Sequence, residues 1–241
     1  MAIGFFILLF IVAFLYASVG HGGASGYLAL MALYGFAPET MKSSALILNL
    51  FVSLTSFLLF FKGGHFKWKL FLPFALASIP LSFIGSTISL EADVYKKILG
   101  VLLLFPVARF FFFPNPEEKD LKNANWPASL LIGGSIGFLS GLIGIGGGII
   151  LSPILLLLKW TNQKQTAAIS ALFIFVNSIA GLAGLFSKCI KLETDILPLV
   201  AIAFIGGITG AWLGSLKFKQ NILKFTLATV LLMASIKLIL T

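Results

Sequence analysis

Four stretches of this chain run for 19 to 22 residues without a charged side chain, and no other feature constrains its fold as strongly. A membrane-spanning helix needs about 20 consecutive apolar residues. Charged residues make up 10% of the chain and hydrophobic residues 59%, whereas a soluble domain carries about 25% charged residues. We therefore predict an all-α polytopic integral membrane protein, whose uncharged runs lie at residues 43–61, 70–90, 166–187 and 196–216.

The charge pattern and the cysteine content exclude several other classes of protein. The formal net charge is +9, but the lysines lie in short loops between apolar runs, which is typical of membrane topology and not of a nucleic-acid-binding patch. Cys189 is the only cysteine, so an internal disulfide is excluded and no redox or metal motif is present. We expect no cofactor, no metal, no catalytic residue and no nucleic-acid partner. The expected partners are the lipid bilayer and a small anionic solute.

Two dense glycine turns interrupt long apolar runs. The first reads Gly20-His21-Gly22-Gly23-Ala24-Ser25-Gly26 within residues 2–33, and the second reads Gly144-Ile145-Gly146-Gly147-Gly148 within residues 128–158. Glycine lacks a Cβ, and at this density the backbone is too free to remain helical. Inside a membrane, a broken backbone must be satisfied by protein, cavity water or a ligand, so such breaks line binding sites. The alternative is that these glycines only permit close helix packing.

The second half of the chain repeats the first at a nearly constant offset. Gly144 follows Gly20 by 124 residues, and Thr166 follows Thr40 by 126. Offsets of 125 or 126 also relate the tripeptide at 44–46 to that at 170–172, Pro73 to Pro198, and Gly85 to Gly210. An ordered series of this kind indicates duplication. The predicted organisation is an N-terminal transmembrane repeat at 1–113, a hydrophilic linker at 114–127 and a C-terminal transmembrane repeat at 128–241.

The repeat can be parallel or inverted. If each glycine-broken segment crossed the membrane once, each half would have four spans and both halves would face the same way. If each segment is a re-entrant hairpin followed by three transmembrane helices, the halves are inverted. The pieces flanking the turns run for about 17 and 11 residues, or about 25 and 16 Å. At least the second is too short for the hydrocarbon core of about 30 Å.

The distribution of cations favours the inverted arrangement. The 17 lysines and arginines divide 9 to 8 between the two sides with eight crossings, but 11 to 6 with hairpins. Loops on the cytoplasmic side carry an excess of lysine and arginine. We therefore predict an inverted repeat with a cytoplasmic linker and both termini outside.

The two restarted helices form the candidate substrate-binding site. The N–H groups of a helix N-terminus lack intrahelical partners and lie at the positive end of its dipole, so such an end binds anions. Inverted hairpins would direct the ends at Ala24 and Gly148 towards each other near the midplane. A cation, hydroxyls and amides could complete the site. The candidate residues are Gly20, His21, Gly22, Gly23, Ala24, Ser25, Lys42, Ser44, Asn49, Gly144, Gly146, Gly147, Gly148, Thr166, Ser170 and Asn177.

Structural interpretations of these candidates stay open. Lys42 could mark the start of a helix and extend to the membrane interface. His21 could hydrogen-bond packed helices together, although an ionisable group at membrane depth that titrates near neutral pH is also a candidate proton carrier. The serines and asparagines could only join helices, at about 0.6 kcal/mol each.

Both glycine turns and the helices after them resemble those of a known family. The first turn is followed by Pro38-Glu39-Thr40 and Ser44-Ala45-Leu46, and the second lies in Ser140–Gly148 and is followed by Gln165-Thr166 and Ser170-Ala171-Leu172. Together they resemble the TauE/SafE family of sulfite-exporter-like permeases over essentially the whole chain. The resemblance implies an exporter in a bacterial-type inner membrane for small sulfur-containing anions such as sulfite, thiosulfate or organosulfonates like sulfoacetate. His21 has no counterpart in the second turn, which carries Ile145 instead.

Several kinds of membrane protein could use such a site. A secondary transporter, with proton coupling as an option, fits the duplication and the paired breaks best. The alternatives are an importer or channel for another small anion, or the permease subunit of a larger pump. The chain has no phosphate-binding Gly-x-x-x-x-Gly-Lys-Ser/Thr motif, so it does not hydrolyse ATP itself. A homodimer is compatible with the sequence.

Overall fold

The secondary structure of the described residues is entirely helical, which confirms the predicted all-α class. The structure is a computed structural model, and it describes residues 3–18, 22–112, 121–188 and 196–216, with the single residues 232, 235, 236 and 239. The helices are α1 (Ile3–Ser18), α2 (Ala24–Leu33), α3 (Pro38–Lys62), α4 (Trp68–Ser86), α5 (Ala92–Phe112), α6 (Trp126–Ile143), α7 (Gly148–Leu157), α8 (Gln163–Ser187) and α9 (Ile196–Leu216).

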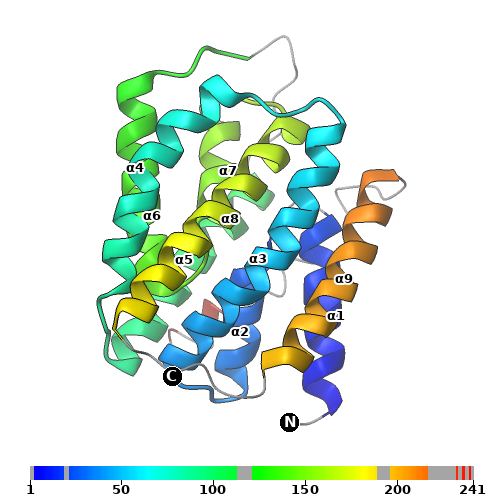
Figure 1. Cartoon of the computed structure of the whole chain (residues 1–241), viewed down its shortest axis with the longest axis vertical. Helices are drawn as coiled ribbons and strands as arrows, with labels where there is room; N and C mark the ends of the chain where they lie inside the picture. Colours follow the sequence, from blue (N-terminus) through cyan, green and yellow to red (C-terminus); the bar gives the residue numbers. More distant parts are fainter. Residues whose placement is uncertain are drawn as a thin grey trace.

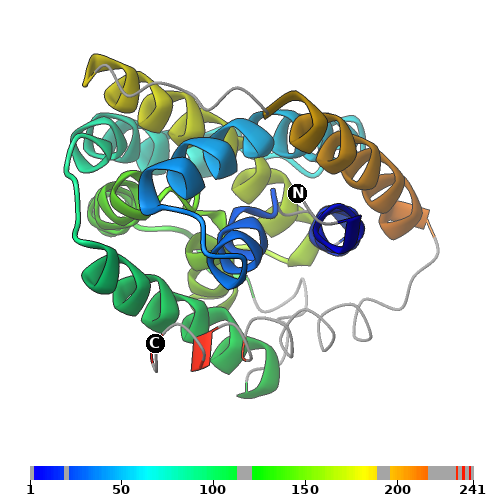
Figure 2. The same cartoon turned by 90° about the horizontal axis from the view of Figure 1, so that it is seen from below.

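Length and burial divide these helices into an outer group and an inner pair. Five of the described helices, α3, α4, α6, α8 and α9, are long and apolar enough to cross a membrane. The two ten-residue helices α2 and α7 are mostly buried and become exposed only at their last residues, Leu33 and Leu157. Helix α2 lies inside the surrounding helices when the bundle is seen from below (Figure 2). Large apolar side chains such as Leu131 and Trp212 are exposed on the outside, whereas Ser53 and Ser56 are fully buried. An apolar exterior around a partly polar interior suits a protein surrounded by lipid.

Each glycine-broken segment closes as a helical hairpin (Figure 1). In the first, the ring of Phe5 near the start of α1 contacts Tyr34 and Phe36 just beyond α2, with centroids 5.0 and 5.5 Å apart. In the second, the Lys122 N–H ahead of α6 donates to the Lys159 carbonyl beyond α7 at 2.7 Å. By length alone α6 could cross a membrane, but α7 returns to the end of the bundle where α6 began.

The two hairpins open towards opposite ends of the bundle. Helix α3 starts directly after the first hairpin, and its 25 residues extend for about 37 Å to the end where α4 begins. A pocket at that end is lined by Lys67 from the start of α4 and by Lys122 and Trp160 from the second hairpin. Figure 1 shows the same arrangement, with α2 near the bottom and α7 near the top. The duplication and the inverted relation of the halves remain predictions from the sequence.

Two helix pairs, α4 with α6 and α1 with α9, pack so closely that glycines of one helix lie against the backbone of the other. A Cβ on Gly133 would lie 2.6 Å from the Phe74 carbonyl oxygen, and one on Gly206 would lie 2.7 Å from the Phe10 carbonyl oxygen. Small residues spaced four apart allow membrane helices to approach this closely. We call these contacts the glycine seams; their glycines are Gly133, Gly137 and Gly141 of α6, Gly85 of α4, and Gly206 and Gly210 of α9.

Adding a methyl group to the α4–α6 seam is expected to destabilise the fold. The Cβ of a Gly137→Ala variant would lie 2.5 Å from the Ser78 Cα, so two backbones must separate. Overpacking of this kind costs about 1–3 kcal/mol, which thermal unfolding of the purified protein would detect. The matched control is Gly134→Ala, one residue earlier on α6, where the nearest atom is the flexible Leu81 Cδ1 at 2.9 Å. Equal losses in both variants would contradict the role of the seam.

Candidate anion site at the two glycine turns

The glycine turns adopt backbone conformations that other residues resist. Gly23, which precedes α2, has φ of 93°, and Gly147, which precedes α7, has φ of 78°. Gly144 and Gly146 have φ of 85° and 73°. A positive φ in this range brings a Cβ close to its own backbone, so glycine is strongly preferred. The sequence-predicted breaks therefore lie at true left-handed turns.

Both restarted helices begin without a side-chain cap. Neither Gly23 nor Gly147 provides a side-chain acceptor for the first N–H groups. In α2, the N–H group of Tyr27 donates to the cap carbonyl of Gly23. In α7, the N–H groups of Ile150 and Leu151 donate to the cap carbonyl of Gly147. The N–H groups ahead of these lie in the first turn and cannot bond within the helix. Each end therefore presents N–H donors together with the positive end of a helix dipole.

The two turns meet at one pair of side chains in the centre of the bundle. A Cβ on Gly22 would lie 2.8 Å from Asn49 Oδ1 and 2.9 Å from Ile174 Cγ2. A Cβ on Gly146 would lie 2.6 Å from Asn49 Nδ2 and 2.8 Å from the same Ile174 methyl. Asn49 lies on α3 and Ile174 on α8, and these two long helices pack against each other. The structure therefore brings together Gly22, Asn49 and Gly146 from the predicted set.

Two buried amides, Asn49 beside the turns and Asn177 on α8, have unused hydrogen-bonding capacity. Asn49 is fully buried; its Nδ2 donates to Ser178 Oγ over a long 3.5 Å, and its Oδ1 has no partner among the described residues. Asn177 Nδ2 donates to the Phe173 carbonyl at 2.8 Å, while its Oδ1 also lacks a described partner. A buried polar atom without a partner is costly and calls for a ligand, a water or a functional explanation.

Ser25 and Gly23 make their contacts within the first hairpin itself. The Ser25 and Tyr16 hydroxyls hydrogen-bond at 2.8 Å, which ties α2 to α1. The ring of Tyr27 packs on the turn, since a Cβ on Gly23 would lie 2.6 Å from its Cζ and hydroxyl oxygen. The Tyr27 hydroxyl is buried without a partner among the described residues. It is a polar group beside the first turn that the sequence pattern did not indicate.

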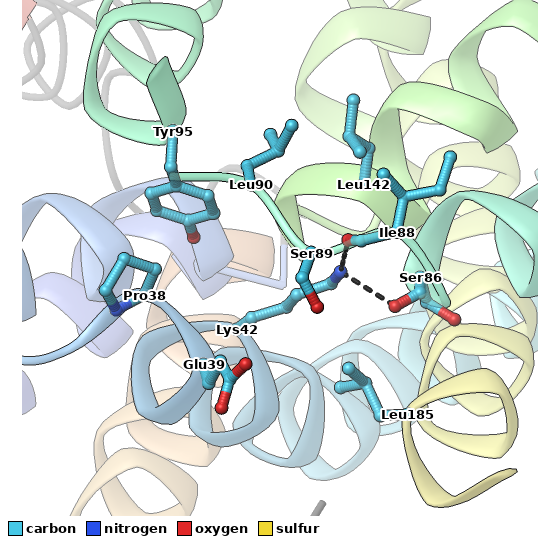
Figure 3. Close-up of a pocket in the computed structure, with 10 residues that line it drawn as sticks. All are labelled: Pro38, Glu39, Lys42, Ser86, Ile88, Ser89, Leu90, Tyr95, Leu142 and Leu185. Atoms are coloured by element: carbon cyan, nitrogen blue, oxygen red, sulfur yellow. Dashed lines mark hydrogen bonds between the residues drawn. The ribbon is translucent and has the colours of Figure 1, made fainter. Parts of the chain in front are cut away.

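Lys42 lies in a separate small pocket, at the end of the bundle where α3 begins (Figure 3). Its ammonium donates to the carbonyls of Ser86 at 3.0 Å and Ile88 at 3.4 Å, where α4 ends. A cation is favourable at a helix C-terminus because the dipole is negative there. The stem of Lys42 contacts the second turn, since a Cβ on Gly144 would lie 2.8 Å from its Cγ. The structure thus places the Lys42 charge against the carbonyls at the end of α4 and just beyond it, and its stem against Gly144.

Ser170 joins α8 to α7, and Thr166 joins α8 to the loop that follows α7. The hydroxyl of Thr166 bonds that of Thr161 at 2.6 Å, and the hydroxyl of Ser170 bonds that of Ser152 at 2.7 Å. Gly148 packs against Ile174 and lies close to the Ser170 carbonyl. Ala24 and Ser44 are buried in the same interior. Gly20 and His21 lie outside the described residues.

Sequence reasoning missed two of the residues at the meeting point, Ser178 and Ile174. Ser178 follows the nominated Asn177 directly in the sequence. Its contact with Asn49 joins two distant helices, so no local pattern indicated it. Ile174 carries no polar group, so no pattern of chemistry could indicate it.

The fold and the site define a multi-pass helical membrane protein with two broken helices that meet in a polar interior. The sequence model of the family described as Sulfite exporter TauE/SafE matches residues 5–238. The chain belongs to this family and is a membrane transporter, as the resemblance implied. Given its bacterial relatives, it is a multi-pass protein of the plasma membrane.

Relatives from bacteria and archaea carry the same general description. The chain is 37% identical to the probable membrane transporter protein y4hK of Sinorhizobium fredii, over 99% of this chain and 98% of that protein. It is 28% identical to a probable membrane transporter protein of Methanocaldococcus jannaschii, over 72% and 68% of the two chains. It is 25% identical to the probable membrane transporter protein YunE of Bacillus subtilis, over 73% and 69%. No solved structure matches the chain.

Proposed function

We propose that the protein is a secondary transporter that exports small sulfur-containing anions, such as sulfite, thiosulfate or an organosulfonate like sulfoacetate. The family description supports sulfite-type substrates and export. The chemistry of the turns supports an anionic substrate. Uncapped helix N-termini and glycine N–H groups are hydrogen-bond donors, and a negatively charged ligand can accept from them. Membership of a transporter family also supports transport rather than catalysis.

The observation that carries this proposal is that both turns contact Asn49. An oxyanion between Gly22 and Gly146 would reach N–H donors from two helix ends, and the Asn49 amide could turn its Nδ2 towards it. Asn49 and Ile174 occupy the space between the turns in this structure. Substrate binding therefore requires these two side chains to change rotamer.

Alternating access is proposed to follow from the two oppositely directed hairpins. Broken helices that meet near the midplane from opposite sides form the substrate sites of many inverted-repeat transporters. The packing supports the inverted repeat, because α1 pairs with α9 as α6 pairs with α4, and α3 contacts α9 as α8 contacts α4. Each hairpin would then close the path towards one side of the membrane. We also propose, from the sequence alone, that His21 couples transport to protons.

Transport by vesicles that contain the purified protein tests the proposal. Efflux of labelled sulfite should saturate, and it should be competed by thiosulfate and sulfoacetate more strongly than by acetate. Unitary currents without saturable exchange would indicate a channel instead. Strict dependence on a co-purifying ATPase would indicate the permease subunit of a pump. Uptake without efflux in oriented vesicles would overturn export while leaving the anion site intact.

The two hairpins also predict which loops face the cytoplasm. The described lysines at the end where the second hairpin opens are Lys62, Lys67, Lys69, Lys122, Lys159 and Lys164, all exposed, so the positive-inside rule assigns this end to the cytoplasm. A cysteine replacing Lys97, at the other end, should react with an impermeant thiol reagent in intact cells carrying Cys189→Ser. A cysteine replacing Lys164 should react only after lysis. If each broken segment crossed the membrane once, both sites would lie on the same side and would label together.

A further inference from the structure

A pocket of about 300 Å³ lies at the lysine-rich end of the bundle, away from the glycine turns. Lys67 and Lys69 contribute to it from the start of α4, and Lys122 contributes from the segment before α6. All three lysines are exposed, and none of the residues that line the pocket is acidic; the other lining residues are Leu70, Pro73, Asn123, Ala124, Trp126, Ser129 and Trp160. The acids Glu117, Glu118 and Asp120, which precede Lys122 in the sequence, lie outside the described residues. The pocket is therefore cationic in the part of the chain that the structure describes.

The walls of this cationic pocket are fixed by the fold. The Lys122 N–H donates to the Lys159 carbonyl, which holds the segment before α6 against the end of α7. Trp160 is 9% exposed, and its ring packs on Phe74 of α4 with centroids 6.2 Å apart. Helix α4 begins at Trp68 beside the pocket, and its cap residue Lys67 provides no side-chain acceptor. The positive end of the α4 dipole therefore adds to the field of the lysines.

An apolar groove of about 500 Å³ continues along the outside of α4 and α6 from the cationic pocket. Pro73 in the pocket and Ala77 in the groove are one turn apart on α4, and Trp126 and Leu130 are one turn apart on α6, so each wall continues along the same helix face. Gly134 has no side chain, so the space between the two helices stays open there. The groove is lined by Ala77, Leu81, Leu130, Leu131, Gly134, Ser135 and Phe138.

We propose that the pocket and the groove together bind one anionic phospholipid of the adjoining leaflet. The phosphate lies among the three lysines, where basic side chains near the surface of a membrane attract anionic headgroups. Trp126 is 49% exposed at the rim, the position at which tryptophan anchors proteins in the headgroup region. An acyl chain lies in the groove, which explains why a cationic pocket opens onto an apolar surface. A soluble anion would use the lysines and leave the groove empty.

Two variants of equal charge test the headgroup contact. In the pocket variant, Lys67, Lys69 and Lys122 are changed to glutamine. In the control, Lys62, Lys159 and Lys164, which lie at the same end but do not line the pocket, are changed to glutamine. Native mass spectrometry of the purified full chain with phosphatidylglycerol and phosphatidylcholine should show at least a tenfold loss of phosphatidylglycerol affinity in the pocket variant and less than a twofold loss in the control. Equal losses would mean diffuse attraction to an anionic surface and would overturn the proposal.

Two further measurements separate a lipid from a soluble phosphate. Glycerol 3-phosphate, which has the phosphate without the chains, should compete with phosphatidylglycerol at least a hundredfold more weakly than the lipid itself. Gly134→Leu, which fills the groove and leaves the lysines in place, should weaken phosphatidylglycerol binding severalfold. Equal binding of glycerol 3-phosphate and the lipid, or unchanged lipid binding by Gly134→Leu, would overturn the proposal.

Discussion

A Gly146→Ala variant is expected to bind substrate at least tenfold more weakly than the wild-type protein. Gly146 has φ of 73°, which alanine adopts only with strain. Its new Cβ would also lie 2.6 Å from Asn49 Nδ2 and 2.8 Å from Ile174 Cγ2, at the proposed anion position. A hydrogen bond to a charged group contributes about 1.5–3 kcal/mol, so losing one donor is enough for this effect. Titration of purified protein with sulfite, thiosulfate and sulfoacetate would measure it.

The chain offers matched controls for this variant. Gly35 and Gly64 also have positive φ, 76° and 73°, but no atom lies within 4 Å of the Cβ that alanine would add. Gly35→Ala and Gly64→Ala therefore impose the same kind of backbone strain far from the turns, and their binding per folded molecule should equal that of the wild type. Equal weakening in the controls, or wild-type affinity in Gly146→Ala, would show that Gly146 serves packing and that the site lies elsewhere.

An Asn49→Leu variant is expected to lose binding and transport by at least tenfold while it gains stability. Asn49 is fully buried, its Oδ1 has no partner among the described residues, and its one described side-chain bond, to Ser178, is 3.5 Å long. An unsatisfied buried polar group costs about 1–3 kcal/mol. Leucine has a similar volume and removes that cost, so the midpoint of thermal unfolding should rise.

Opposite changes in stability and function identify a residue that is retained for its chemistry. The control is Ser56→Ala on the same helix, because Ser56 is also buried and its hydroxyl lacks a described partner. It should gain stability and keep wild-type substrate affinity. A destabilised Asn49→Leu variant, or one that transports normally, would assign Asn49 to helix packing.

The helices and their breaks could be predicted from the sequence because they depend on local properties. Uncharged length identified α3, α4, α8 and α9, and glycine density located both turns. The all-α class and the membrane-transporter family are confirmed. Glycine density could not tell which glycines open a site and which hold helices together. Gly85 and Gly210 match each other in the repeat, as the turns do, yet both lie in glycine seams.

The composition of the site could be predicted only in part, because its contacts join distant segments. Asn49 and Ser178 are 129 residues apart, and no local pattern specifies that they touch. Lys42 was nominated as the cation of the site, but its ammonium donates to the carbonyls of Ser86, the last residue of α4, and of Ile88 just beyond it. A lysine in a helix start looks the same in the sequence whether it binds a ligand or the end of another helix.

The glycine seams have a consequence for how the chain is assembled during synthesis. Each seam joins a helix made early to one made late: α1 waits for α9, and α4 waits for α6. Until α6 has been synthesised, α4 cannot form its close backbone contact with the glycines of that helix. Helix α1 cannot form its own contact until α9 has been synthesised, which is later still. An isolated N-terminal fragment, ending after α5, would therefore lack both of its closest contacts. Co-expression of the two fragments, rather than either one alone, should be needed to recover a folded protein.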